Sequence, residues 1–180
     1  MWDTIDIKNL VVIDETGVNL AMTRNYSRCQ GGARFYYNRP GNKGKNLTLI
    51  GAISEVGLIA TMTFPGSLNT ATFLAFLDKI LLHQLWIGAI VVRDNLPVHY
   101  AETTKALIES VGCPVKFLPP YSPEKSPLEL CWSKLKEILR SQAARTSDAL
   151  DEAITMAVNL INDENALNWF NHCGLFFEPI

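Results

Sequence analysis

Hydrophobic and polar positions along the chain follow two different periods. Short apolar runs rich in β-branched residues, bounded by glycine or polar residues, predict strands. Glycine at position 17 predicts a turn after the first of them. The predicted strands cover residues 9–14, 18–22, 47–54, 58–64, 89–93 and 115–118.

Apolar residues at spacings of three and four predict helices. Phe73, Phe76 and Leu77 recur in this way, and Ser67 or Asn69 can cap the helix that contains them. Pro127 suits the first turn of a later helix. The predicted helices cover residues 70–84, 98–111, a segment starting at 127, and 147–162, with a short helix after it.

The order of these elements predicts the fold class. Strands come first as hairpins and later alternate with helices, which indicates an α/β domain with a mixed sheet. A chain of 180 residues suits one domain that buries a sizeable core. No repeat or linker divides it, so we expect residues 1–180 to form a single domain.

Composition excludes several classes of protein. The chain is 48% hydrophobic and 19% charged, which excludes a disordered tail and a collagen-like rod. No apolar run reaches the roughly 18 residues that a membrane span needs, and the acidic Asp3 and Asp6 interrupt any secretory signal. No CxxC pair is present, so we expect reduced, mostly buried thiols in a cytosolic protein. The four cysteines are Cys29, Cys113, Cys131 and Cys173.

The formal net charge of −2 argues against a protein that coats nucleic acid by bulk charge, but the charge is uneven. Residues 24–45 hold six basic residues and no acidic one, whereas residues 146–180 hold six acidic residues and no Lys or Arg. Aromatic residues interleave the basic ones, which suits contact with phosphates and unstacked bases. A solvated hairpin is the alternative interpretation. The six basic residues are Arg24, Arg28, Arg34, Arg39, Lys43 and Lys45.

Acidic residues follow two of the predicted strands. Asp14 ends the first strand and Asp94 ends the strand at 89–93. If these strands are parallel neighbours, both carboxylates meet at one edge of the sheet. A third carboxylate would complete a site for a divalent ion such as Mg²⁺, and such a site can hold two ions about 4 Å apart in phosphodiester chemistry. The candidates are Glu15, which would point to the other face, Glu124, and Glu129, which we favour because a rigid loop places it in the first turn of a helix.

Three segments carry a resemblance to a known family. They read VVIDETG at 11–17, VVRDNLPVH at 91–99 and LPPYSPEKSPLELCW at 118–132. They resemble the DDE transposases of the Tc–mariner superfamily, most closely its bacterial insertion-sequence branch. Glu129 follows Asp94 with 34 residues between them, which resembles the DD34E spacing of that superfamily. The ending NWFNHCGLF at 168–176 is also similar to that of the branch.

The resemblance implies an RNase H-like fold, with about five strands in a mixed sheet flanked by helices. It implies that Asp14, Asp94 and Glu129 bind Mg²⁺ or Mn²⁺, with two ions per site. The implied activity is hydrolysis at transposon ends, followed by attack of the freed 3′-hydroxyl on target DNA. The implied partners are transposon-end and target DNA and a second copy of the chain. The implied location is the bacterial cytoplasm, in association with the nucleoid.

The chain departs from the family pattern at two places. Family members usually carry Asn before the proline of the third motif, where this chain has Ser126. They also carry an N-terminal helix-turn-helix region that reads DNA, whereas here the first catalytic strand begins by residue 10. We therefore expect either a split reading frame, whose upstream product supplies that region as a partner or by fusion, or a truncated remnant.

Further residues near the motifs are candidates for a role in the site or in DNA binding. Asn95 can cap a helix or lie next to the metal ligands, and His99 can touch the scissile phosphate, orient Asp94 or lie at the surface. Tyr121 can pack the proline-rich loop or meet DNA. Lys136 shares the helical face of Glu129 and can reach DNA.

Two other functions remain open at this point. One is an inactive transposase remnant that still binds DNA. The other is a cellular RNase H-like nuclease, although such enzymes typically use four carboxylates and lack the stiff PPYSP loop found at 119–123.

Overall fold

A five-stranded mixed sheet forms the centre of the molecule. The computed structural model describes residues 6–34, 36, 38, 40–93, 98–118 and 125–175, with the side chains of 98–101 left out. Within these ranges the strand order is β3-β2-β1-β4-β5. β1 pairs antiparallel with β2 and parallel with β4, and the outer pairs are antiparallel β2–β3 and parallel β4–β5. The strands are β1 (Leu10–Val18), β2 (Leu47–Ser54), β3 (Gly57–Pro65), β4 (Ile90–Arg93) and β5 (Val115–Phe117).

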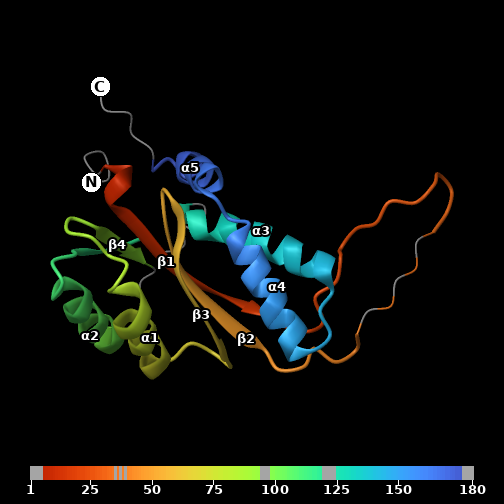
Figure 1. The fold of residues 1–180 in the computed structure, drawn as a ribbon, viewed down its shortest axis with the longest axis horizontal. Helices are drawn as coiled ribbons and strands as arrows, with labels where there is room; N and C mark the ends of the chain where they lie inside the picture. The colour runs from red at the N-terminus through yellow and green to blue at the C-terminus, as the bar shows by residue number, and fades with distance from the viewer. Residues whose placement is uncertain are drawn as a thin grey trace.

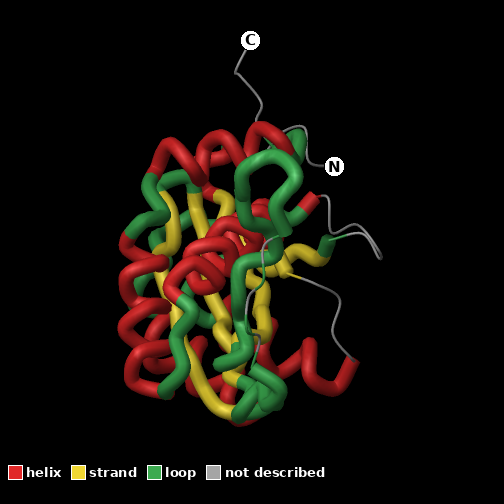
Figure 2. Tube along the Cα trace, turned by 90° about the vertical axis from the view of Figure 1, so that its right-hand side faces the viewer, coloured by secondary structure: helices red, strands yellow, loops and turns green. Residues whose placement is uncertain are grey.

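Helices cover both faces of this sheet (Figure 1). One face carries α1 and α2, and the other carries α3, α4 and α5. Figure 2 shows the strands with helices around them. A single 3₁₀ turn, Ile7–Asn9, precedes β1, and a π-helical turn, Leu77–Leu81, continues α1. The helices are α1 (Thr70–Phe76), α2 (Val98–Glu109), α3 (Pro127–Gln142), α4 (Ser147–Asn159) and α5 (Asp163–His172).

Alternation along the strands builds two apolar cores. In β1, Leu10 and Val12 pack toward α3, whereas Val11 and Ile13 pack toward α1 and α2. Because successive strand residues point to opposite faces, the sheet is buried on both sides in its centre. The predicted α/β class with a mixed sheet is confirmed.

The prediction of a turn at Gly17 is wrong. β1 continues through Gly17, which pairs with Thr48, and ends at Val18, which pairs with Leu47. The predicted return strand at 18–22 is therefore not formed. The backbone ladder to β2 holds this glycine in extended conformation, and no neighbouring atom would meet a Cβ there. The turn was predicted from one glycine, and a local signal of this kind holds no information about pairing with a strand that is distant in sequence.

The chain leaves the sheet after β1 as an arm, residues 19–46. Its described residues extend well beyond the helices and the sheet (Figure 1). At the base of the arm the amide of Leu20 donates to the carbonyl oxygen of Lys43, with 3.2 Å between the two atoms. The two limbs of the arm are thus joined where they leave the body.

The predicted helices are found with small shifts in their ends. Asn69 caps α1 in a capping box with Thr72, as one of the two predicted caps. α4 is capped by Thr146. No helix in the described part of the chain is long and apolar enough to cross a membrane.

Candidate active site

Asp14 lies on the face of the sheet that α3 covers. It follows Leu10 and Val12 at even positions of β1, and both of these pack in the α3 core. Its side chain is half-buried, and one carboxylate oxygen accepts a hydrogen bond of 2.8 Å from the amide of Glu15. By the same alternation Glu15 faces the opposite side, as the sequence predicted for a strand that continues past it.

α3 lies directly on the strand beside Asp14. Asp14 pairs across the ladder with Gly51 of β2, and a Cβ added to Gly51 would be 2.7 Å from Cη2 of Trp132. Trp132 is 1% exposed and lies in the core under α3. This close contact is possible only because residue 51 has no side chain, and it sets the height of α3 above Asp14.

Glu129 is positioned by the same contact. It lies one turn before Trp132 on the same side of α3, and its side chain is exposed. Asp14 and Glu129 therefore both border the contact between Trp132 and Gly51. Pro127 begins the helix, with Ser126 at the N-cap. The hydroxyl of Ser126 is buried and has no hydrogen-bond partner in the described part of the chain.

β4 is the parallel neighbour of β1 on the side away from β2. The carboxyl ends of both strands therefore point to the same edge of the sheet. Val12 pairs with Val92, and Ile90 and Val92 face α3. The described part of β4 ends at Arg93. Several predicted site residues lie outside the described residues, so the structure does not test their positions. These are Asp94, Asn95, Tyr121, Glu124 and Arg39, together with the side chain of His99.

Arg93, at the end of β4, is a further residue near the candidate site that the sequence motifs did not single out. Its guanidinium is 5% exposed and donates from Nη1 to the hydroxyl of Thr104 at 3.0 Å. Its guanidinium carbon also lies 4.2 Å from the centroid of the Phe73 ring. These contacts tie the end of β4 to α2 and α1. The signal in the sequence that could have indicated Arg93 is an arginine at the end of an apolar strand, directly before Asp94.

Among the described residues, no three acidic, His or Cys side chains come close enough to hold a metal ion. Two of the three predicted ligands, Asp14 and Glu129, are described, and residue 94 is not. The two described carboxylates offer hard oxygen ligands of the kind that Mg²⁺ prefers.

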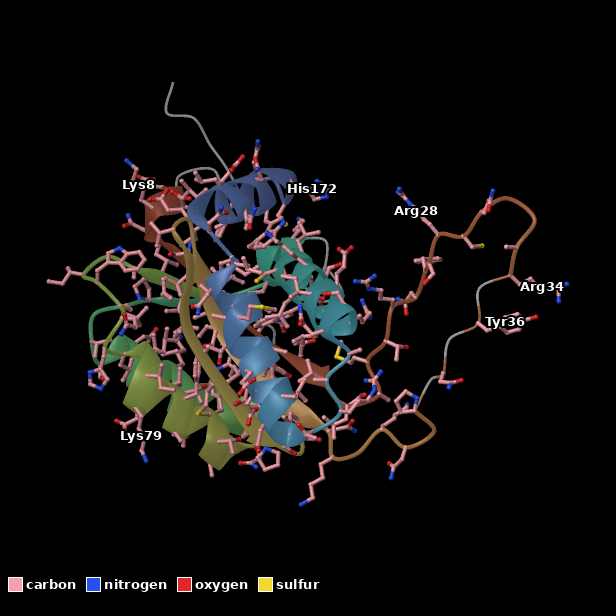
Figure 3. The ribbon with its side chains drawn as sticks, turned by 45° about the vertical axis from the view of Figure 1, so that its right-hand side comes forward. Lys8, Arg28, Arg34, Tyr36, Lys79 and His172 are labelled. Atoms are coloured by element: carbon pink, nitrogen blue, oxygen red, sulfur yellow. The ribbon has the colours of Figure 1, made fainter. Side chains whose placement is uncertain are left out.

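The arm carries the predicted basic residues on its surface. Arg28, Arg34 and Tyr36 lie on the part of the arm that extends beyond the body (Figure 3). Tyr26 is 91% exposed and Tyr36 is 82% exposed. None of the described basic residues of the arm forms an ion pair with a described carboxylate; these residues are Arg24, Arg28, Arg34, Lys43 and Lys45. Lys136 is half-buried on α3 near the base of the arm.

A family model described as "DDE superfamily endonuclease" matches residues 9–151 of this chain. That range contains all five strands, α1 to α3 and the start of α4. No curated protein shows significant similarity to the chain.

Solved structures of Mos1 transposase have a similar fold. The "Mos1 transposase paired-end complex with left transposon end" is similar with a TM-score of 0.75 and 20% identity, over 92% of this chain and 52% of that chain. The "catalytic domain of Mos1 mariner transposase" is similar with a TM-score of 0.65 and 17% identity, over 96% of this chain and 85% of that chain. The chain thus spans about half the length of the longer Mos1 chain. This likeness confirms the expected RNase H-like fold.

Proposed function

Because this chain belongs to the DDE superfamily of endonucleases, we propose that it is the catalytic domain of a Tc–mariner-type transposase. In this proposal the domain cuts DNA and joins the freed end to new DNA, using divalent metal ions held by Asp14, Asp94 and Glu129. The alignment of β1 with β4 is the observation that carries the proposal.

The register of these two strands supports the pairing of Asp14 with Asp94. Val12 lies beside Val92 in a parallel ladder, so a continuation by two residues would bring positions 14 and 94 side by side. Both would fall on the face that α3 covers, because side chains alternate along each strand. Arg93, fixed by Phe73 and Thr104, would hold residue 94 at that edge.

A set of three carboxylates fits Mg²⁺ or Mn²⁺, which take oxygen ligands and leave positions for water and phosphate. Mos1 structures are described as complexes with Mg and with Mn, and we propose the same metals here, with two ions per site. Bound metal ions supply positive charge that activates a water or hydroxyl oxygen and stabilises the oxygen that leaves phosphorus.

The other residues of the site position the proposed metal ligands. Trp132 sets the position of Glu129 over the sheet, and Pro127 fixes the first turn of the helix that carries it. Asn95 and His99 are proposed as neighbours of the metal ligands. In the first step water attacks the phosphorus of a phosphodiester and the P–O3′ bond breaks, which leaves a 5′-phosphate and a free 3′-hydroxyl. In the second step that 3′-hydroxyl attacks a phosphorus of target DNA, and the 3′-oxygen of the target strand leaves as a new 3′-hydroxyl.

DNA is the proposed partner, since Mos1 is described in complexes with a transposon end and in a strand transfer complex. The arm would bind phosphates, because its cations are exposed and lack described acidic partners. Arg39, Tyr121 and Lys136 are proposed as further contacts. We also propose a homodimer on paired ends, with end recognition from an upstream DNA-binding region.

Cleavage of labelled duplex DNA in Mg²⁺ or Mn²⁺ tests the proposal. Glu129→Gln should reduce the rate by at least about 100-fold, since loss of a group that supports transition-state charge typically costs that much. Glu152→Gln on the outer surface of α4 is the matched control and should cut at the wild-type rate. Equal cleavage by Glu129→Gln and wild type would remove Glu129 from the triad, and Glu124→Gln would then be the variant to test.

Further measurements on the wild-type protein test the two alternative functions. An inactive remnant would show neither cleavage nor a rise in melting temperature with Mg²⁺. An RNase H-like nuclease would cut RNA–DNA hybrids and fail to join a 3′-hydroxyl to a second duplex. Metal-dependent strand transfer would contradict both alternatives.

A further inference from the structure

A hollow of about 500 Å³ lies where the arm leaves the body, at the end of β1 beyond Asp14. β1 contributes its end, α3 contributes its second half, and both limbs of the arm form the remaining walls. Figure 1 shows the arm leaving the body beside the end of α3. The lining includes Gly17, Asn19, Asn25, Lys43, Lys136 and Arg140.

Three cations and no described acidic residue line this hollow. Lys43 comes from the returning limb of the arm, and Lys136 and Arg140 come from α3. None of the three forms an ion pair with a described carboxylate. Lys136 and Arg140 are four residues apart on one helix, where like charges repel. A bound anion would offset this repulsion.

Specific backbone contacts hold the walls of the hollow in place. Nη1 of Arg145, at the turn after α3, donates to the carbonyl oxygens of Leu20 at 2.9 Å and of Met22 at 3.1 Å. The amide of Leu20 bonds to the carbonyl of Lys43. The outgoing limb is thus tied both to the returning limb and to the end of α3, so the three cations are brought together by tertiary structure.

The hollow lies at a similar distance from both described carboxylates. Gly17 is three residues beyond Asp14 along β1, which corresponds to about 10 Å. Lys136 is seven residues beyond Glu129 along α3, which is also about 10 Å along the helix axis. Successive base pairs of DNA are about 3.4 Å apart along the duplex axis, so this distance corresponds to about three nucleotides.

We propose that this hollow binds one backbone phosphate of the DNA strand held at the carboxylates, about three nucleotides from the phosphate that is cut. The inference rests on the proposed function, and it names Arg140 as a DNA-binding residue beside Lys43 and Lys136. A phosphate contact of this kind fixes the position of the strand without reading its sequence.

DNA binding measured by fluorescence anisotropy in EDTA tests the site without catalysis. The double variant Lys136→Gln, Arg140→Gln should bind a duplex about tenfold more weakly, and the slope of log K against log salt should become shallower by about 0.9. Lys79→Gln, at an exposed position next to α1 and away from the arm (Figure 3), is the charge control. The charge-preserving pair Lys136→Arg, Arg140→Lys should restore most of the affinity.

Either of two results would overturn the proposal. One is a double variant that loses no more affinity than Lys79→Gln or keeps the wild-type salt slope. The other is a wild-type chain that does not bind DNA. Binding that depends on the hollow, in a protein that does not cut DNA with metal, would support this site and contradict the proposed function. Metal-dependent cutting by the wild type, with DNA binding unchanged in the double variant, would support the proposed function and contradict this site.

A scan of single neutral methylphosphonate linkages then locates the bound phosphate in a duplex whose cut site is mapped. The linkage about three nucleotides from the cut should weaken binding to the wild type and leave the double variant unaffected. Equal losses in both proteins at every linkage would contradict a phosphate in this hollow. Competition by inorganic phosphate with no dependence on linkage position would indicate a site for free phosphate instead.

Discussion

At the scale of single residues, Gly51 has the most specific structural role that we identify. Its missing side chain lets Cη2 of Trp132 come within 2.7 Å of the place where a Cβ would stand. Gly51 also pairs with Asp14, and Trp132 lies one turn after Glu129. One glycine thus governs both the packing of α3 and the spacing between two proposed metal ligands.

We predict that Gly51→Ala destabilises the protein by about 1–3 kcal/mol, because the added methyl group forces the buried indole and α3 to move. Urea unfolding measures this change in the free energy of unfolding. Metal-dependent cleavage should fall with it, because Glu129 shifts with the helix. Gly17→Ala, where a Cβ meets no atom within 4 Å, is the matched control and should leave stability within about 0.5 kcal/mol of wild type. Equal stabilities for both variants would contradict the close contact.

At the scale of elements, Arg145 connects the base of the arm to the turn after α3. This arginine is exposed, yet its Nη1 donates to the carbonyl oxygens of Leu20 and Met22 across more than a hundred residues of sequence. It follows the left-handed residue Ala143, which ends α3. The end of a helix therefore holds the start of a loop that is remote in sequence.

We expect Arg145→Ala to loosen the base of the arm and leave the sheet intact. Loss of hydrogen bonds worth about 1 kcal/mol in total should speed hydrogen exchange at the Leu20 amide about fivefold. Exchange of amides in β2 within the same sample provides the internal reference and should not change. Uniformly faster exchange throughout the sheet would mean that Arg145 supports the whole fold and does not act locally on the arm.

At the scale of the whole molecule, the sheet separates two cores that each contain a buried thiol. Cys131 lies in the core under α3, and Cys113 lies in the core under α1 and α2. Burial raises the pKa of the Cys131 thiol to about 12, and it also raises the pKa of Cys113. Cys29 is exposed, so the expectation of mostly buried thiols is correct for only part of the set.

Stability should therefore fall as the pH rises from about 9 toward 12. In this range the unfolded Cys131 thiol loses its proton while the folded one keeps it, so the unfolded state binds fewer protons and gains stability. The difference in unfolding free energy between wild type and Cys131→Ala, followed against pH, isolates this contribution from other titrations. A difference that does not change with pH would contradict the raised pKa.

Thiol labelling tests whether the two cores unfold together. In a background of Cys29→Ser and Cys173→Ser, only the buried Cys113 and Cys131 remain. If the sheet couples both cores into one cooperative unit, both thiols should react at the same rate, set by global unfolding. Faster labelling of one thiol would show that its core opens separately.

Much of the fold was predictable because its signals are local. The apolar run at 47–54 became β2 with those ends, and Pro127 began α3, since period and helix-start chemistry act within a few residues. The motifs around positions 14, 94 and 129 were enough to indicate the family that the family model also matched. The roles of those three residues stay predictions, because residue 94 lies outside the described part of the chain.

The amino-acid sequence by itself determined the fold class, most of the strands and helices and the family, because periodicity and motif spacing are properties of neighbouring residues. Only tertiary structure decided that Gly17 stays in a strand, that Gly51 receives Trp132, and that Arg93 is fixed between two helices. It also decided that Lys43 and Arg140 line the same hollow. Each of these depends on a contact between residues distant in sequence, and that contact exists only once the sheet has paired and α3 has packed on it.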